Sequence, residues 1–531
     1  MDTKLLKLSS IGRAGINTDL PPWELRAEHI TYGENFRILN SKIVPAGGKK
    51  EMLPVPYLWA DGDVAGVINN IRVPTGDYWL LCTRKKVLAT SSRRGWYDAG
   101  QFDYNLPIGL ENEWVISQMG SVVVINNPAS APEYWAGLKF GLKFKLLPYD
   151  QDNTWEDMNL TCRTMRAHKN FLIAMNISGQ SGDLPSGYMI SHPAEENSIP
   201  YTWSTTDRSS LAQEGQLGGD GVEIVDGATL RDAFYMYSRD SIDVFTFNAG
   251  SEFPWSRREF SPSIGLISSN CLIEANGVHY FITQTDLMKN DGSQVVSITN
   301  DRIKNRFKAR INADAFGSSY MTHQAEFNEI WFCIPEDESI VANTAFVYNW
   351  LNDSWSIRDI PEGVSYSDYG YDPLSIDEAE SYGLWATSIE GWSSATRSWA
   401  NIRSLELIRT LGGITTDGRL LSIDPLQGSD IPVNCVLERT DFPLDDLRQT
   451  NTITRIYPTA DGDPFNIEIG SQEHAGGPVT WRPPVVFDPG KDRKIDVRST
   501  GEMMAWRVSS IGNNSFSLSG MMIEYSNSGV R

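Results

Sequence analysis

The chain of 531 residues lacks any apolar run close to the ~20 residues that a membrane-spanning helix requires. Its first residues, MDTKLLKLSSIGRAGINTDLPP, contain no apolar stretch of the length of a secretory signal before a small-residue cleavage site. We therefore expect neither a secreted precursor nor an integral membrane protein.

Cysteine is scarce, and its distribution excludes a disulfide framework. The five cysteines are odd in number, lie far apart, and mostly fall inside apolar segments that look like strands: Cys82, Cys162, Cys271, Cys333 and Cys435. This pattern predicts buried free thiols in a protein made in a reducing cytoplasm.

Catalytic motifs are also missing. The six histidines have no spacing suited to a metal: His29, His168, His192, His279, His323 and His474. There is no G-x-S-x-G, no phosphate-binding G-x-x-x-x-G-K and no G-x-G-x-x-G after a strand. The acidic clusters are DGD at 61–63 and 461–463, and Asp441 with Asp445 and Asp446. We interpret them as turns or solvated loops, with a calcium or catalytic carboxylate site as the alternative. The sequence thus predicts no enzyme, no cofactor, and no catalytic, cofactor-binding or metal-binding residues.

Aromatic and turn residues are abundant. The chain has 17 Trp, 20 Tyr and 20 Phe beside 44 Gly and 27 Pro. Aromatic residues favour strands, while glycine and proline favour turns, so the composition predicts an all-β protein. Basic residues number 46 against 67 acidic ones, which gives a net charge of −21. This acidity argues against a protein that grips DNA through its phosphates. It suits a conduit that lets DNA slide, or it only keeps the protein soluble.

A hairpin unit recurs along much of the chain. It consists of a strand, a short polar turn and a second strand, and it begins near residues 77, 113, 169, 232, 277, 328 and 381. Propeller blades repeat at roughly this spacing, so the pattern favours a β-propeller over an array of β-sandwiches. Several units close on a tryptophan: Trp135, Trp203, Trp255 and Trp355. We expect these rings to pack one blade on the next, with a sugar-binding platform as the alternative.

The predicted organisation has four parts. An N-terminal extended or β segment covers 1–56, the β-propeller 57–400, a linker 401–430, and a C-terminal β domain 431–531. Six segments of the last part alternate apolar and polar residues, as in a small antiparallel sandwich. The best helix candidate is 299–316, with Ile303, Phe307 and Ile311 on one face.

Three stretches resemble the tail hub or nozzle of short-tailed, podovirus-type bacteriophages, also called the packaged-DNA stabilisation protein. They are GINTDLPPWELRAEHITYGENFRILNSKIVPAGGKKEMLP (15–54), a blade-to-blade stretch at 234–298, and the closing segment at 494–531. A fourth segment, SHPAEENSIPYTW (191–203), matches a recurrent blade corner of those proteins. The segments 96–107 and 140–165 have no counterpart, so the resemblance leaves the number of blades open.

The resemblance implies a β-propeller with added β domains in a structural protein of the virion tail, assembled in the host bacterial cytoplasm. Six copies would form a ring that encloses the DNA exit channel, retains packaged DNA and passes it during ejection. The implied partners are further copies of the chain, a portal-side adaptor, tail fibres or spikes and, transiently, the phage genome. Two other readings remain: a glycan-binding or glycan-cleaving propeller, and a propeller scaffold that binds peptides.

Overall fold

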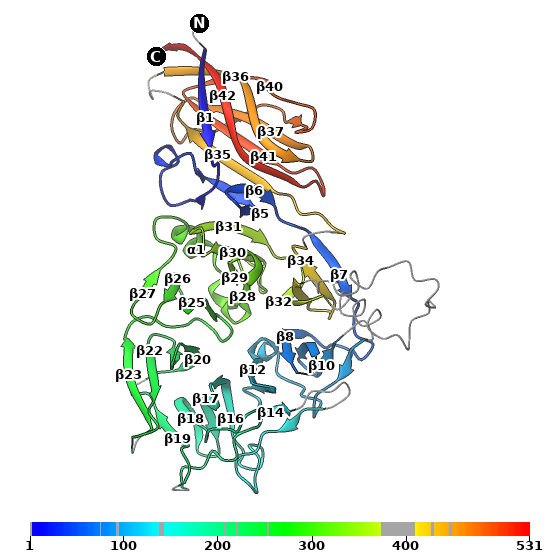
Figure 1. Ribbon diagram of the computed structural model, residues 1–531, viewed down its shortest axis with the longest axis vertical. Helices are drawn as coiled ribbons and strands as arrows, with labels where there is room; N and C mark the ends of the chain where they lie inside the picture. Colours follow the sequence, from blue (N-terminus) through cyan, green and yellow to red (C-terminus); the bar gives the residue numbers. More distant parts are fainter. Residues whose placement is uncertain are drawn as a thin grey trace, which may run out of the picture.

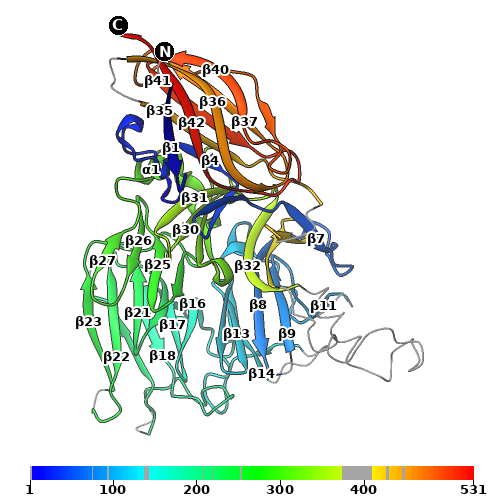
Figure 2. The same cartoon turned by 45° about the horizontal axis from the view of Figure 1, so that its top comes forward.

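The computed structural model describes residues 3–74, 76–91, 95–136, 143–206, 209–218, 221–251, 254–372, 409–425, 430–444 and 449–530. Within them the chain forms two bodies, a β-propeller and a β-sandwich that sits on the rim of the propeller (Figures 1 and 2). Both termini lie at the far end of the sandwich (Figure 1). The described helices include none that is both long and apolar enough to cross a membrane.

The propeller has seven sheets among the described residues, and all their pairings are antiparallel except those of β2 in blade six, so the expected all-β propeller is confirmed. Blade one contains β8 (Ala65–Val73), β9 (Gly76–Thr83), β10 (Val87–Thr90) and β11 (Tyr97–Asp98). Blade two contains β12 (Val115–Met119), β13 (Val122–Asn127), β14 (Ser130–Ala136) and β15 (Lys145–Leu146). Blade three contains β16 (Thr161–His168), β17 (Phe171–Gly179), β18 (Gly182–Ile190) and β19 (Gln213–Gln216).

The remaining four blades continue around the ring. Blade four contains β20 (Ile224–Leu230), β21 (Ala233–Ser238), β22 (Ile242–Phe247) and β23 (Trp255–Ser261). Blade five contains β24 (Leu272–Ala275), β25 (Val278–Ile282), β26 (Leu287–Asn290) and β27 (Val295–Ser297). Blade six contains β28 (Tyr320–Gln324), β29 (Glu329–Ile334), β30 (Thr344–Asn349) and β31 (Ser354–Asp359), extended by β2 (Gly15–Ile16) and β3 (His29–Ile30). Blade seven contains β32 (Val364–Tyr371), β33 (Arg409–Thr415), β34 (Leu420–Ile423) and β7 (Lys49–Leu53).

The first strand of each blade faces the centre of the ring. Each of these strands contacts the first strand of the next blade, and β32 of blade seven contacts β8 of blade one, which closes the circle. The middle strands are mostly apolar and pack on both faces, so β13 and β29 are buried at every position. This two-sided burial makes the blades one continuous, rigid body.

The expected helix at 299–316 is only partly present. The α-helix α1 covers Lys304–Arg310, and a 3-10 helix, η3 (Ala313–Ser318), follows it. Ile303 and Phe307 are buried as expected, but Ile311 has extended dihedral angles and forms a β-bridge with Glu336, which ends the helix. The other described helices are single 3-10 turns: η1 (Pro22–Glu24), η2 (Leu110–Glu113) and η4 (Ala325–Phe327).

The sandwich consists of two antiparallel sheets, which confirms the expected C-terminal β-sandwich. The first sheet has the order β40–β36–β42–β6–β5, with β1 also paired to β42. Its strands are β1 (Thr3–Ser9), β5 (Phe36–Leu39), β6 (Lys42–Pro45), β36 (Gln449–Gly462), β40 (Ile495–Gly501) and β42 (Phe516–Val530). The second sheet has the order β38–β37–β41–β35–β4, with β39 also paired to β37. Its strands are β4 (Tyr32–Glu34), β35 (Val436–Phe442), β37 (Phe465–Gln472), β38 (Thr480–Trp481), β39 (Val485–Phe487) and β41 (Met503–Ser509).

The domain boundaries differ from the prediction at two places. Residues 1–56 are not a separate segment, because their strands belong to the sandwich, to blade six and to blade seven. The linker expected at 401–430 was wrong for residues 409–423, because β33 and β34 complete blade seven. Gly412 and Gly413 lie within β33. A Cβ atom on Gly412 would come within 2.5 Å of the Trp79 ring, so glycine here allows close packing.

Candidate functional site

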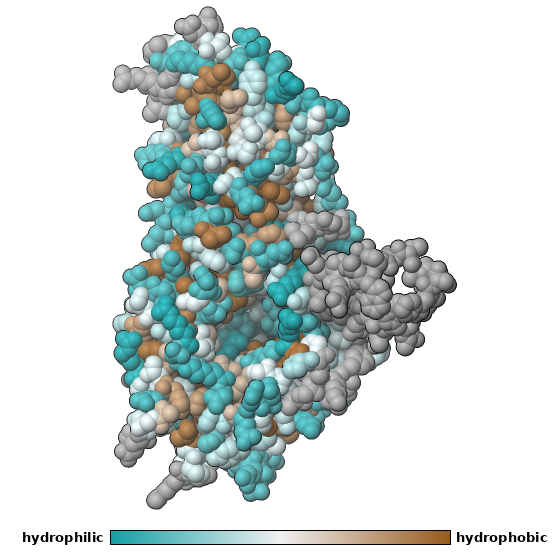
Figure 3. Space-filling view, viewed as in Figure 1, coloured by the Kyte–Doolittle hydropathy of each residue, from teal (hydrophilic) through white to brown (hydrophobic). Residues whose placement is uncertain are grey.

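The centre of the propeller is the first candidate site. A space-filling view down the ring shows a hollow there, bordered mainly by hydrophilic residues (Figure 3). The first strands of the blades line this region because each blade turns its first strand toward the axis. Side chains alternate along each of these first strands, so every second side chain points away from the contact between blades. Several of these side chains are charged.

A buried ion pair connects four blades near the axis. Arg166 of β16 donates from Nε to Asp226 Oδ1 over 2.8 Å and from Nη2 to Asp226 Oδ2 over 2.5 Å. Asn270 donates its backbone N–H to Asp226 over 3.2 Å and its Nδ2 to the carbonyl oxygen of Trp114 over 2.9 Å. Burial lowers the pKa of Arg166, but attraction to Asp226 outweighs it and raises that pKa. The bidentate pair therefore fixes neighbouring blades in register.

A second group of linked ion pairs lies on the face of the propeller where the first strand of each blade begins. Arg163 contacts Glu113 over 3.0 Å and also pairs with Glu223, which accepts from Arg239 Nε over 2.7 Å. Small-molecule sites are clefts of roughly 300–1,000 Å³, and the cavity beside these ion pairs measures about 640 Å³. Its charged lining residues are Arg163, Glu113, Asp183 and Glu223. The wall is therefore acidic overall and suited to a cationic or neutral polar group.

Asp368 marks the place where the ring closes. It lies on β32, and its Oδ2 accepts from the backbone N–H of Asn70 on β8 over 2.8 Å. Asn69 Nδ2 and the backbone N–H of Tyr369 also donate to this carboxylate. Burial nevertheless raises the pKa of Asp368 to about 6, against the opposing effect of these donors. The carboxylate therefore changes charge near neutral pH, at the contact between the first and last blades.

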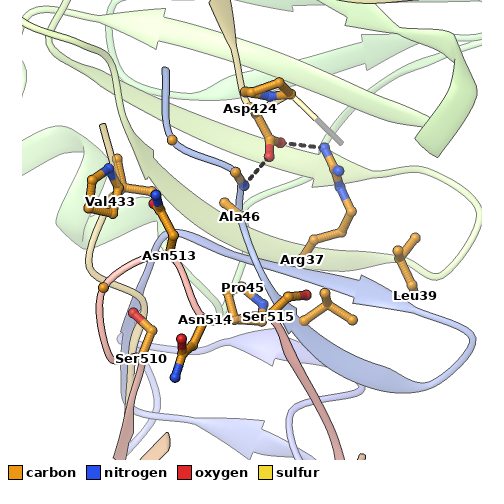
Figure 4. Close-up of a pocket in the computed structure, with 16 residues that line it drawn as sticks. Arg37, Leu39, Pro45, Ala46, Asp424, Val433, Ser510, Asn513, Asn514 and Ser515 are labelled. Carbon is orange, nitrogen blue, oxygen red and sulfur yellow. Dashed lines mark hydrogen bonds and ion pairs between the residues drawn. The ribbon is translucent and has the colours of Figure 1, made fainter. Parts of the chain in front are cut away.

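A second candidate site lies at the junction of the two domains (Figure 4). Arg37 of β5 contacts Glu329 of β29 over 2.8 Å and Asp424, just beyond β34, over 2.6 Å. Arg358 of β31 contacts Glu329 over 3.2 Å and also pairs with Asp424. These four side chains are 2–5% exposed, and their charges sum to zero. We name them the junction quartet.

Two members of the junction quartet, Arg37 and Asp424, line a cavity of about 440 Å³ between the sandwich and the residues that follow β34 of blade seven. Asp424 also accepts from the backbone N–H of Gly47 over 2.5 Å, and the Arg37 guanidinium lies 3.5 Å from the centre of the Phe327 ring. Burial opposes the charge of Glu329, but Arg37 and Arg358 lower its pKa overall. The ion pairs of the junction quartet thus join the sandwich to the propeller. Sequence reasoning missed Arg37, and its only signal was an arginine within the apolar segment NFRIL.

The acidic clusters singled out in the sequence differ from one another: residues 61 and 62 form a turn as expected, whereas Asp461 lies at the end of β36 and Asp441 lies within β35, so the expectation of a turn or solvated loop was wrong for these two residues. Asp63 accepts from Thr83 Oγ1 over 2.8 Å and from the backbone N–H of Lys85 over 3.0 Å. Asp461 pairs with Lys42, while Asp463 accepts from the backbone N–H of Ser515 over 3.0 Å. Asp441 is buried and accepts from Gln472 Nε2 over 3.0 Å. Asp445 and Asp446 lie outside the described residues. Among the described residues, no three His, Cys, Asp or Glu side chains form a metal-binding group.

The cysteines and the blade tryptophans follow the sequence prediction. All five cysteines are free and buried. Trp135, Trp203, Trp255 and Trp355 are at most 4% exposed, and the Trp203 ring lies 4.9 Å from that of Trp155 in an edge-to-face contact. These four rings therefore pack inside and between blades, and none of them presents a face to a sugar.

Two histidines far apart in the sequence meet at one residue of blade four. His168 Nδ1 lies 2.9 Å from Thr229 Oγ1, and His279 Nε2 lies 2.9 Å from the carbonyl oxygen of Thr229. Both rings are fully buried, and burial lowers the pKa of each to about 4. The rings are therefore neutral structural groups at neutral pH.

The fold and these sites define a seven-bladed β-propeller protein with an appended β-sandwich. No family model and no curated protein matches the sequence. Solved structures that it resembles include YCF48 from Cyanidioschyzon merolae, with 11% identity, a TM-score of 0.37, and coverage of 72% of this chain and 100% of that one. An exo-β-1,3-galactanase from Phanerochaete chrysosporium gives 10% identity, a TM-score of 0.25, and coverage of 86% and 95%. The extracellular domain of the hybrid two-component system BT4673 from B. thetaiotaomicron gives 10% identity, a TM-score of 0.40, and coverage of 87% and 58%. Similarities this low say nothing about activity or partners.

Proposed function

We propose that the chain is a structural protein of a short phage tail. In this proposal it forms a ring, as a hub or nozzle, that encloses the DNA exit channel, retains packaged DNA and passes it during ejection. The observation that carries the proposal is the position of residues 15–54, the first stretch that resembles phage tail hubs. Their strands belong to both domains and to the closing blade, so this stretch joins the molecule together.

The other two stretches that resemble phage tail hubs also coincide with structural units. Residues 234–298 contain most of β21 and all of β22 to β27, the passage from blade four to blade five. Residues 494–531 contain β40, β41 and β42, the closing strands of the sandwich. The resemblance led us to expect a blade-to-blade passage and a closing sheet at these two places. This agreement supports the proposal more than any single motif does.

The distribution of charge is consistent with a conduit. Residues 57–430, which contain most of the propeller, have 28 basic and 48 acidic residues, a net charge of −20. Residues 1–56 and 431–531 together have 18 basic and 19 acidic residues. An acidic propeller repels phosphate groups, so DNA could slide past it without being held. The proposed partners are further copies of the chain, a portal-side adaptor, tail fibres or spikes and, transiently, genomic DNA.

Electron microscopy of the virion tests this proposal. An antibody against the chain should label the tail, and a reconstruction should place six copies around the exit channel. A reconstruction with five-fold or twelve-fold symmetry at this protein would contradict the six-copy ring. Purified virions that contain none of the chain would contradict the tail assignment altogether.

A second candidate function is binding or cleavage of a glycan at the propeller axis. It is favoured by two carboxylates in different environments, as glycosidases require. Asp368 has its pKa raised to about 6, whereas Asp226 is ion-paired with Arg166. Burial raises the pKa of Tyr366, and the charges of both Asp368 and Asp226 add to this shift, so the two carboxylates face the same interior.

An activity assay tests the second candidate. If the site is catalytic, the purified protein should hydrolyse a bacterial surface or cell-wall glycan, and Asp368→Asn should reduce the rate at least about a hundredfold. Asp417→Asn, at a carboxylate that is 57% exposed on blade seven, should leave that rate unchanged. Lack of hydrolysis by the wild-type protein on such glycans would remove the catalytic form of this candidate.

A further inference from the structure

Three arginines of the described residues are buried, and one of them has no carboxylate partner there. Arg37 and Arg358 belong to the junction quartet, where Glu329 and Asp424 balance their charges. Arg439 of β35 is 1% exposed, and within the described part of the chain it forms no ion pair. A buried charge without a counter-charge is costly, so Arg439 departs from the rule that the junction quartet follows.

The guanidinium of Arg439 uses one of its three nitrogens. Nη2 donates to the carbonyl oxygen of Leu25 over 2.8 Å, whereas Nε and Nη1 are buried and have no partner among the described residues. The centre of the Phe442 ring lies 6.0 Å from Cζ, at the outer limit of a cation–π contact. A guanidinium carries five N–H donors, so the described residues supply too few acceptors for this group.

Asp441 lies on the same strand, but its side chain is bound elsewhere. Its Oδ1 accepts from Gln472 Nε2 over 3.0 Å and from the backbone N–H of Gly476 over 2.5 Å. Burial lowers the pKa of Arg439 to about 10, and the charge of Asp441 opposes this shift without cancelling it. The guanidinium is therefore still charged at neutral pH, and Asp441 compensates that charge only in part.

A second nitrogen without a partner lies close to Arg439. His29 Nδ1 of β3 is buried and forms no hydrogen bond within the described residues. Burial lowers the pKa of His29, and the charges of Arg302 and Arg439 lower it further, so the ring is neutral at neutral pH. A neutral imidazole can carry its proton on Nδ1 and donate it to an acceptor.

Residues 17–28 connect Arg439 to the propeller. Their 3-10 turn η1 contacts β35, where Arg439 lies. At the other end of this segment, the backbone N–H groups of Thr18 and Asp19 donate to the carbonyl oxygen of Arg302 over 2.7 and 3.1 Å, next to α1. The segment thus joins the sandwich to the propeller, and one of its attachments is the guanidinium with the unused donors.

We propose that Arg439 binds one small anion, chloride, beneath residues 17–28. A water molecule would supply an acceptor but no charge, whereas an anion supplies both. The unused nitrogens are buried, and Arg439 lines neither of the two cavities described above, so the ligand must be small. Chloride at this position stabilises the segment that joins the two domains. The site goes beyond the proposed tail function and does not depend on it.

Thermal unfolding of the purified full-length chain tests the site. Chloride replaces gluconate at a constant total salt of about 0.5 M, so the screening of other ion pairs stays the same. A ligand that binds only the folded state stabilises it by mass action. The melting temperature of the wild type should therefore rise by about 1–3 °C as chloride replaces gluconate, and the rise should saturate.

Matched variants show whether Arg439 is responsible. Arg439→Met removes the charge, so the chloride dependence should disappear. In gluconate alone this variant should be at least as stable as the wild type, because it no longer buries an unpaired charge. Arg498→Met, at an exposed position of β40 in the same domain, should keep the wild-type dependence. An equal chloride effect in wild type and Arg439→Met would overturn the proposal.

A crystallographic measurement tests the site without any substitution. Bromide replaces chloride at halide sites and scatters X-rays anomalously, so crystals of the wild type in sodium bromide should show anomalous density beside the Arg439 guanidinium. Density for water alone at this position, or bromide only at the protein surface, would overturn the proposal. Absence of the chain from virions would contradict the tail function and would leave the anion site standing.

Discussion

The buried charged residues of this molecule depend on ion pairs with their neighbours. The junction quartet places two arginines and two carboxylates in the interior, where each charge is tolerated only because its partners are present. Removing one member of such a group leaves an uncompensated buried charge, which costs more than the pair itself contributes. An ion pair on the surface behaves differently, since water replaces the lost partner.

Arg37→Met is therefore expected to destabilise the protein by about 3–5 kcal/mol. It leaves Arg358 alone to balance Glu329 and Asp424, both of which remain buried. The free energy of unfolding from urea titration measures the effect. Arg419→Met is the matched control, because Arg419 is 52% exposed in its pairs with Glu51 and Asp417. Similar losses in both variants would contradict a special role for the junction quartet.

The buried histidines predict a dependence of stability on pH. The folded-state pKa of His279 is about 4, below the ordinary value of 6.5, so the unfolded chain takes up the proton first. Stability from His279 is therefore complete above pH 6.5 and is lost as the pH falls toward 4. The slope approaches about 1.4 kcal/mol per pH unit in that window.

Urea unfolding of His279→Gln and wild type between pH 7 and about 4.5 measures this slope, because the variant has no proton to take up at that position. Glu133, whose pKa burial raises to about 7, acts in the opposite sense, but it is present in both proteins and cancels in the comparison. His474→Gln, at an exposed position, should keep the wild-type slope. Equal slopes in wild type and His279→Gln would show that His279 does not carry this effect.

Individual strands close the ring at blade seven. Three of its strands come from residues 364–423, and the fourth is β7 from the N-terminal segment. The seam against blade one is tight. The Trp79 indole donates to the carbonyl oxygen of Tyr371 over 2.8 Å and lies against the backbone of β33 at Gly412. This closeness explains why a glycine occupies the middle of a strand.

Gly412→Ala is expected to destabilise the propeller by roughly 1–3 kcal/mol, because the added methyl group would overlap the Trp79 ring. Thermal unfolding followed by tryptophan fluorescence should report the loss. The control is Gly218→Ala, since no atom lies within 4 Å of a Cβ atom at Gly218. If Gly412→Ala unfolds at the same temperature as the wild type, the contact between blades one and seven adjusts without loss of stability.

At the scale of the whole molecule, local features could be predicted from the sequence, whereas contacts between distant segments could not. Local patterns predicted the hairpins that begin near residues 77, 113, 169, 232, 277 and 328, the buried tryptophans and thiols, and the six C-terminal strands, because each depends on neighbours close in the chain. The hairpin expected near residue 381 lies outside the described residues. Long-range pairing was not predictable. Nothing near residues 49–53 indicates that they pair with β34, and nothing near Arg37 indicates that Glu329 and Asp424 will surround it. The predicted end of the propeller at residue 400 was wrong for a related reason. Glycines that close packing requires, such as Gly412, look like turn residues in the sequence.

The charge of the whole molecule predicts weak binding to DNA. If the chain is a conduit, duplex DNA should bind it only weakly even at about 50 mM salt, where screening is least. Fluorescence anisotropy with a labelled duplex is a direct measurement. Tight binding at about 50 mM salt that is lost by about 200 mM would instead reveal a basic track, and the protein would then act as a clamp on the genome.

The pairing of β1 with β42 has a consequence for synthesis. Residues 3–9 leave the ribosome long before their partners at 520–526 are made. At roughly 5–20 residues per second, the first strand waits about half a minute to two minutes for its partner. Contacts this distant in the chain also slow folding itself. A chain whose translation stops early therefore cannot complete the sandwich, so only finished copies would be competent to enter an assembly.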